Sequence, residues 1–131
     1  AAVLTWANSR IGDPYVFGAN GPDAWDCSSF TQAAYARIGI TIPRTAGAQR
    51  NWLAAGNGFR VSPGQEQPGD LIFIDSYLGP NQIGHVMLVH DPAKTLTIEA
   101  GGDKVDNYDY SRRANNNIYE IWRVGSTISP R

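Results

Sequence analysis

The sequence has few residues that build covalent or metal cross-links. It contains one cysteine, Cys27, and two histidines, His85 and His90. A single cysteine excludes an internal disulfide and any cysteine-rich zinc site. The two histidines lack metal-site spacing with a third ligand. Cross-linking of either kind is therefore not expected to hold this fold together.

The chain also lacks an excess of charge and any long apolar run. Its 11 basic and 12 acidic residues give a net charge of −1, which does not favour binding to nucleic acid or a membrane surface. The apolar runs 71–74 and 86–89 have the length of strands and are too short to span a bilayer. Residues 1–6 lack the charged start and the long apolar stretch of a signal peptide. The sequence is thus expected to be cytosolic, or a mature or excised domain.

What the sequence does have is enough apolar material for one core. Its 131 residues, of which 42% are hydrophobic, predict a single domain over residues 1–131. Apolar spacing and turn residues predict helices in the first half, at 3–11, 27–38 and 45–55. Apolar or alternating runs predict strands in the second half, at 70–75, 83–90, 95–100 and 118–124. Residues 61–69 are expected to form a loop, and 103–117 to be irregular. Helices followed by a meander of strands indicate an α+β fold.

Cys27 lies where a helix is expected to begin, with Asp26 as a candidate N-cap and Gly39 as a candidate stop. A thiol in the first turn of a helix feels the positive end of the helix dipole, which favours its thiolate form. A histidine within hydrogen-bond reach would make that thiol an activated nucleophile. The competing interpretation is that Cys27 is a small buried hydrophobic residue.

Either histidine could serve as the base, and the two are expected to point to opposite faces of one strand. We favour His85, because the preceding Gly84 leaves room for an approaching group, and we expect His90 to be a solvated turn residue. The group that orients the base could be Glu99, Thr97 or a carboxylate elsewhere. Glu99 lies in the next strand, where antiparallel pairing could bring it beside His85. A solubilising charge on an edge strand is the alternative for Glu99.

Other chemistries fit the sequence less well. Its glycines match no dinucleotide-binding or phosphate-loop spacing. Asp70 and Asp75 bracket one apolar strand, so a glycosidase pair is conceivable. Carboxylates at strand ends are usually exposed, and we expect these two to be solvated.

Five short blocks of sequence resemble the NlpC/P60 family of cell-wall cysteine peptidases, which belong to the papain-like superfamily. In chain order they are Gly12-Asp13-Pro14-Tyr15-Val16-Phe17-Gly18, Asp26-Cys27-Ser28-Ser29-Phe30, Gly39-Ile40-Thr41-Ile42-Pro43-Arg44, Gln67-Pro68-Gly69-Asp70-Leu71-Ile72-Phe73 and Gly84-His85-Val86-Met87-Leu88-Val89. The blocks follow the family's order and cover residues 3–124. The resemblance implies a papain-like α+β fold in which N-terminal helices pack on an antiparallel sheet of about five strands.

The resemblance also implies an activity. Members of the family cleave peptide stems of bacterial peptidoglycan, commonly between D-γ-glutamate and a diamino acid such as meso-diaminopimelate. Cys27 matches the nucleophile and His85 the base, and Glu99 falls at the position of the third polar residue. No cofactor is implied. We expect a monomer that acts on stem peptides at the cell wall or outside the cell, with any signal peptide or further domains outside this sequence.

Substrate-binding residues follow from the same resemblance. Tyr15 matches a tyrosine that lines the site, and Asp26 and Ser28 match residues that help to bind the stem peptide. Arg44 is a fourth candidate, for which a surface salt bridge is an equal alternative.

Two positions depart from the family's pattern. Ser29 and Met87 stand where glycine is usual, and both are expected to add bulk near the catalytic groups. Two other functions stay open. One is a peptidoglycan-binding module without hydrolysis, and the other is an amidase or acyltransferase on the same fold.

Overall fold

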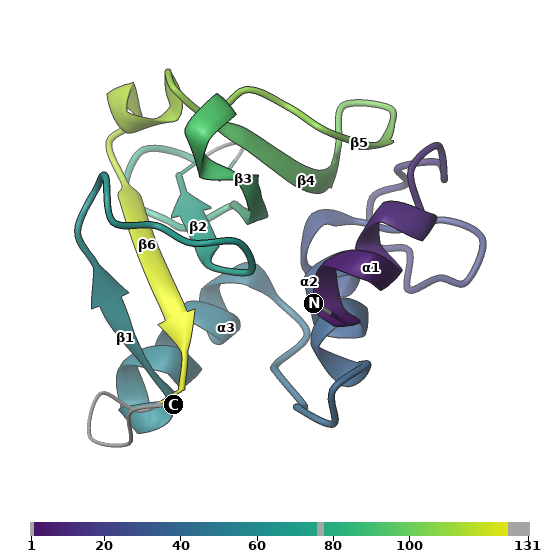
Figure 1. The fold of residues 1–131 in the computed structure, drawn as a ribbon, viewed down its shortest axis with the longest axis horizontal. Helices are drawn as coiled ribbons and strands as arrows, with labels where there is room; N and C mark the ends of the chain where they lie inside the picture. Colours follow the sequence, from purple (N-terminus) through teal and green to yellow (C-terminus); the bar gives the residue numbers. More distant parts are fainter. Residues whose placement is uncertain (1, 76–77, 126–131) are drawn as a thin grey trace.

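The computed structural model describes residues 2–75 and 78–125, which form an α+β structure (Figure 1). The α-helices are α1 (Ala2–Ser9), α2 (Cys27–Ala36) and α3 (Ala46–Trp52). A π-helical turn, Leu53–Asn57, continues α3, and two 3₁₀ turns lie at Pro92–Lys94 and Arg113–Asn115. The strands are β1 (Gly58–Val61), β2 (Leu71–Ile74), β3 (His85–Asp91), β4 (Leu96–Gly101), β5 (Lys104–Asp106) and β6 (Tyr119–Val124).

The six strands make one antiparallel sheet in the order β1-β6-β2-β3-β4-β5. The α+β class and the four strands expected from the sequence are confirmed, with small differences at their ends. Two short strands were not expected. β1, which lies in a segment flanked by glycine and loop residues, pairs with β6. β5, which lies in the segment expected to be irregular, pairs with β4.

The described part of the chain holds no helix that is both long and apolar enough to cross a bilayer.

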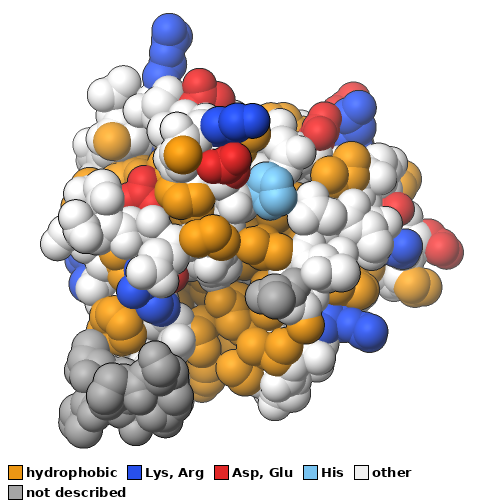
Figure 2. Space-filling model, viewed as in Figure 1, with side chains coloured by type: hydrophobic (Ala, Val, Ile, Leu, Met, Phe, Trp, Pro, Cys, Tyr) orange, Lys and Arg blue, Asp and Glu red, His pale blue; other side chains and the backbone are white. Residues whose placement is uncertain are grey.

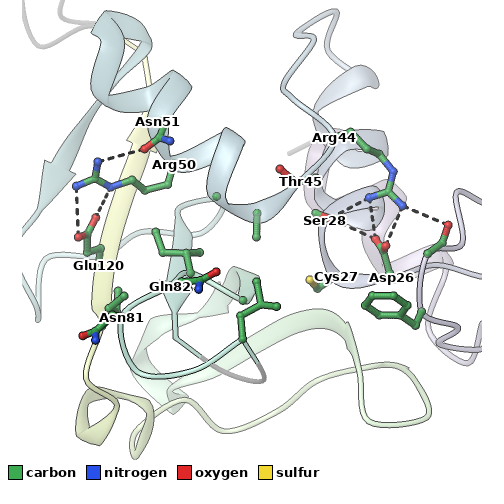
Figure 3. Close-up of a pocket in the computed structure, with 18 of the residues that line it drawn as sticks. Asp26, Cys27, Ser28, Arg44, Thr45, Arg50, Asn51, Asn81, Gln82 and Glu120 are labelled. Atoms are coloured by element: carbon green, nitrogen blue, oxygen red, sulfur yellow. Dashed lines mark hydrogen bonds and ion pairs between the residues drawn. The ribbon is translucent and has the colours of Figure 1, made fainter.

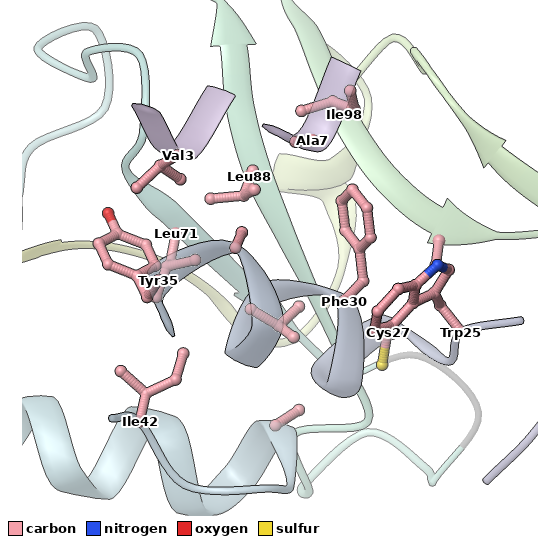
Figure 4. Packing of buried hydrophobic residues seen from close by; sticks show 14 of the residues in the cluster. Val3, Ala7, Trp25, Cys27, Phe30, Tyr35, Ile42, Leu71, Leu88 and Ile98 are labelled. Atoms are coloured by element: carbon pink, nitrogen blue, oxygen red, sulfur yellow. The ribbon is translucent and has the colours of Figure 1, made fainter. Parts of the chain in front are cut away.

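The helices cover one face of the sheet. α2 packs on β3 and β4, and α1 packs on α2 (Figure 1). Phe30 of α2 is fully buried beside Trp6 and Trp25, with ring centroids 5.5 and 6.2 Å away (Figure 4). Alternate residues of β3, Val86 and Leu88, join this cluster. The intervening residues, among them Met87, join a smaller cluster on the opposite face.

A double cap fixes the start of α2. The Asp26 carboxylate accepts a hydrogen bond from the Ser29 backbone N–H at 2.8 Å, and the Ser29 hydroxyl accepts one from the Asp26 N–H at 3.0 Å. This reciprocal arrangement is a capping box, and it satisfies backbone donors that a helix start leaves open. The expected N-cap is confirmed. Cys27 is consequently the first residue of the helix, in a fixed position.

A buried amide joins α2 to α3. The Gln49 side chain is fully buried and donates to the carbonyls of Ser28 and Pro43, each at 2.9 Å. It accepts a hydrogen bond from the Thr31 hydroxyl at 2.9 Å. Because a buried amide is costly unless satisfied, these bonds fix α3 against the turn that carries the cysteine.

The capping box predicts a stability effect at Ser29. Ser29→Ala removes the shorter of two hydrogen bonds made by the buried Asp26 N–H, which also donates to the Ala19 carbonyl, and should lower the free energy of unfolding by about 0.5–1.5 kcal/mol. Urea denaturation followed by circular dichroism measures this change. The matched control is Ser62→Ala at an exposed loop position, expected to change stability by less than about 0.5 kcal/mol. Equal effects of the two substitutions would contradict the assigned role of Ser29.

Candidate active site

Cys27 lies at the floor of a groove of about 890 Å³ (Figure 3). One end of the groove is lined by Asp26, Ser28 and Arg44, and the other end by Arg50 and Glu120 (Figure 3). The thiol is not exposed on the outer surface, because Cys27 is buried within the core cluster beside Trp25 and Phe30 (Figure 4). Figure 2 shows one face of the molecule, on which hydrophobic side chains gather at the centre and a histidine lies beside acidic and basic side chains at their upper border. The groove therefore gives a substrate access to Cys27.

His85 stands at the start of β3, between Cys27 and Glu99. Its Nε2 lies 2.8 Å from Oε1 of Glu99, and its ring is also hydrogen-bonded to Cys27. Burial disfavours the imidazolium, but the hydrogen bonds to Cys27 and Glu99 and the negative charge of Glu99 outweigh it. Together they raise the pKa of His85 from about 6.5 to about 9. The imidazole thus contacts both a thiol and a carboxylate.

Antiparallel pairing of β3 with β4 brings Glu99 to this histidine, as the sequence analysis expected. Glu99 is 2% exposed, so its charge needs compensation from within the protein. Burial opposes its ionisation, but the hydrogen bond and charge of His85, followed by the charge of Arg113, hold the pKa of Glu99 below its usual range. Arg113 Nη2 lies 3.4 Å from Glu99 Oε1, and the Thr97 hydroxyl donates to Oε2. Thr97, the alternative orienting group, therefore contacts Glu99.

A second cavity, of about 410 Å³, opens on the Glu99 side of His85. Its lining includes Tyr108 and Arg113, as well as Tyr15, which also lines the groove. Tyr15 therefore lies where the sequence analysis expected it, beside the candidate catalytic residues. Gly84 lines the groove too, but the group that approaches it closely is Leu78 of this chain, whose backbone nitrogen would lie 3.1 Å from an added Cβ.

The polar end of the groove is an ion-pair network. Arg44 Nη2 lies 2.8 Å from Asp26 Oδ2, and Arg44 Nη1 donates to the Ser28 hydroxyl at 2.9 Å (Figure 3). Burial acts to raise the pKa of Asp26, but hydrogen bonds from Arg44 and Ser29 lower it below its usual range. Arg44 thus forms a salt bridge and lines the groove at the same time. The structure brings all the candidate site residues to the groove or to the cavity behind His85.

Neither residue that departs from the family's pattern lines the groove among the residues that the structure describes. The Ser29 hydroxyl is buried in the capping box. Met87 is fully buried in the cluster on the sheet's other face, where Arg113 contacts its sulfur. Among the residues that the structure describes, neither lines the groove or the second cavity.

Three other sequence expectations are wrong. Asp70 and Asp75 are buried: Asp70 pairs with Arg123 at 2.8 Å, and Asp75 accepts from the backbone N–H of Ile118. Each carboxylate therefore has a structural partner, which removes the case for a glycosidase pair. His90 is half-buried in β3, beside a register shift, and within the described ranges its buried Nδ1 has no hydrogen-bond partner.

Sequence reasoning missed Arg113, because it falls in the segment expected to be irregular. No periodic pattern could have shown that this side chain returns to Glu99. Within residues 2–75 and 78–125, no three His, Cys, Asp or Glu side chains are grouped so that they could hold a metal ion.

Comparison with known proteins matches the sequence profile of the NlpC/P60 family to residues 12–123. A Listeria innocua protein named probable endopeptidase p60 is 37% identical over 106 residues, which are 81% of this chain and 21% of the relative. A Bacillus cereus protein named gamma-D-glutamyl-L-lysine dipeptidyl-peptidase is 33% identical over 96 residues, which are 68% of this chain and 27% of that protein. The chain therefore spans about a fifth to a quarter of the length of these relatives.

Solved structures share the whole fold. A lipoprotein-like NLP/P60 family protein from Staphylococcus aureus superposes with a TM-score of 0.77 at 28% identity, covering 96% of this chain and 41% of that one. RipD of Mycobacterium tuberculosis superposes with a TM-score of 0.75 at 27% identity, covering 94% and 95%. RipD is described as a non-catalytic NlpC/p60 domain protein adapted to peptidoglycan binding.

The contact between His85 and Glu99 makes a spectroscopic prediction. Glu99→Gln keeps the side chain's shape but removes its charge, so the pKa of His85 should fall from about 9 towards 6.5. NMR titration of the imidazole protons measures it, and His90, the other histidine, serves as an internal control. An unchanged His85 titration in the variant would contradict the assigned role of Glu99.

Proposed function

The chain belongs to the NlpC/P60 family, and we propose that it is a peptidoglycan hydrolase: a cysteine endopeptidase that cleaves stem peptides. The observation that carries the proposal is that His85 contacts both Glu99 and Cys27, and that Cys27 lines the groove. A thiol, a base and a group that orients the base are what nucleophilic cysteine catalysis requires. The proposal makes residues 1–131 one catalytic domain.

In the proposed mechanism, the Cys27 thiolate attacks the carbonyl carbon of the scissile amide. The backbone N–H of Cys27, in the open first turn of α2, is a candidate donor to the oxyanion that develops. His85 donates its proton to the leaving amine as the C–N bond breaks, which leaves a thioester on Cys27. His85 then takes a proton from water as that water attacks the thioester, and the C–S bond breaks to release the acid product and restore the Cys27 thiolate. Glu99 holds the imidazole in orientation and stabilises its protonated form.

A binding module without hydrolysis is the second candidate, and RipD is the observation in its favour. The site itself argues against a binding module, because Cys27, His85 and Glu99 are all present and His85 contacts the other two. A silent groove would not need the buried charge of Glu99, which is costly to keep. The intact site therefore supports turnover.

The bond that we propose is the one between D-γ-glutamate and the diamino acid, commonly meso-diaminopimelate in this family. The name of the Bacillus cereus relative, which specifies a γ-D-glutamyl–L-lysine linkage, supports this choice of bond. Tyr15, Asp26, Ser28 and Arg44 are the proposed binding residues, because they line the groove beside Cys27. The Asp26–Arg44 pair presents both an acceptor and a donor to a peptide there.

Such a substrate places the action at the cell wall, outside the cytoplasm, and the reaction needs no cofactor. We propose that the domain acts as a monomer, because the thiol, the base and the groove all come from one chain.

Digestion of defined muropeptides tests the function. Purified protein should release the two fragments of the D-γ-glutamyl–diamino acid bond, identified by mass spectrometry, and Cys27→Ala should release neither. Loss of the nucleophile alone should reduce turnover by about 10³-fold or more.

Other products would overturn the proposal in specific ways. Cleavage at the sugar–peptide junction would identify an amidase, and transfer to an added amine would identify an acyltransferase. Binding of stem peptide without any product would identify a binding module.

A further inference from the structure

The end of the groove away from Asp26 carries a second charged cluster, which the proposed mechanism does not use. Arg50 of α3 reaches Glu120 of β6 there, with Nε 2.9 Å from Oε1 and Nη2 3.4 Å from Oε2 (Figure 3). Both side chains line the groove, and Asn51, Asn81 and Gln82 line it beside them.

This cluster has one positive charge in excess. Arg60 of β1 lies on the same carboxylate, with Nη1 3.9 Å from Glu120 Oε2. Two guanidinium groups therefore share one carboxylate, which also accepts a hydrogen bond from the Trp122 indole at 2.8 Å. At the opposite end of the groove, Arg44 is matched by Asp26 one to one. The uncompensated charge thus lies at the Arg50 end.

The two arginines are held in place before any ligand binds. Their Cζ atoms lie 5.4 Å (Arg50) and 5.8 Å (Arg60) from the centre of the Trp122 ring. Stacking on an indole and pairing with a carboxylate both restrict a guanidinium, which reduces the entropy lost on binding. Arg50 has five N–H groups, and two of them have no acceptor among the described residues. Oriented free donors of this kind suit a carboxylate.

We propose that Arg50, supported by Arg60, forms a subsite for a free carboxylate of the stem peptide. This inference rests on the proposed function and adds a feature of the substrate that the same groove would recognise. The carboxylate can come from three sources in such a peptide: the α-carboxylate that a γ-linked glutamate leaves free, the side chain of a dicarboxylic diamino acid, or the peptide's own C-terminus. The subsite would favour a stem in which that carboxylate is free over one in which it is amidated.

Binding to the inactive Cys27→Ala protein tests the subsite without turnover. Isothermal titration calorimetry would compare four synthetic stem tetrapeptides: one with all three carboxylates free, and one each amidated at the glutamate α-carboxylate, at the diaminopimelate side chain and at the C-terminus. We expect one of the three amides to bind about five- to tenfold more weakly than the free acid, and that amide identifies the source. The same preference should appear in KM when the wild-type protein digests the four peptides.

Substitutions then assign the preference to the cluster. Arg50→Gln in the Cys27→Ala background should remove the difference between free acid and amide, and Arg60→Gln, at a more exposed side chain, should reduce it. Arg112→Gln removes one positive charge at an exposed position outside the groove and should leave the difference intact. Thermal unfolding of each variant shows whether it is folded. If Arg50→Gln does not fold, the reduced difference between free acid and amide in Arg60→Gln still tests the subsite.

Two results would overturn the subsite. Equal binding of all four peptides to the Cys27→Ala protein would do so, as would an amide penalty that survives both the Arg50 and Arg60 substitutions. Neither result bears on whether the wild-type protein hydrolyses the stem. Absence of cleavage with the carboxylate preference retained would instead contradict the proposed function and leave the subsite standing.

Discussion

The buried contact between His85 and Glu99 is the interaction on which the candidate site depends. A carboxylate that is 2% exposed is costly to keep charged, and the structure compensates it with His85, Arg113 and the Thr97 hydroxyl. The sheet makes this arrangement possible, because β3 and β4 are neighbours and pair antiparallel. The order of the strands therefore places Glu99 beside His85. This contact is one of the causes that raise the pKa of His85 to about 9.

The helical half positions Cys27, the proposed nucleophile, through a few specific contacts. A capping box fixes the first turn of α2, and the packing of Phe30 among the tryptophans fixes the helix on the sheet. Gln49 then fixes α3, which extends the groove from Cys27 towards Glu120 (Figure 3). The fold thus places a thiol from the helices beside an imidazole from the sheet. The ion pair of Arg50 and Glu120 lies at the far end of that groove.

Local patterns in the sequence were sufficient to predict the start of α2 and the contact between two neighbouring strands. A polar residue before an apolar helical run predicted the cap at Asp26, and two successive strands predicted that Glu99 could reach His85. The patterns failed where long-range contacts decide the outcome. β1 and β5 have only four and three residues, and their partners, rather than their own composition, make them strands. The burial of Asp70 depends on Arg123, 53 residues away, and the support of Glu99 by Arg113 comes from a segment without periodicity. Ser29 was expected to crowd the site, because its hydroxyl's role in the cap is visible only once the backbone of the turn is known.

The central claim is that His85 activates Cys27, and the rate of thiol alkylation tests it most directly. Cys27 is the only cysteine, so reaction with iodoacetamide reports on this one side chain without any substrate. At pH 6.5, where an ordinary thiol is mostly protonated, the wild-type protein should be alkylated about tenfold faster, or more, than His85→Gln. Equal alkylation rates in two folded proteins would contradict the claim, and Cys27 would then be a buried hydrophobic residue rather than a nucleophile.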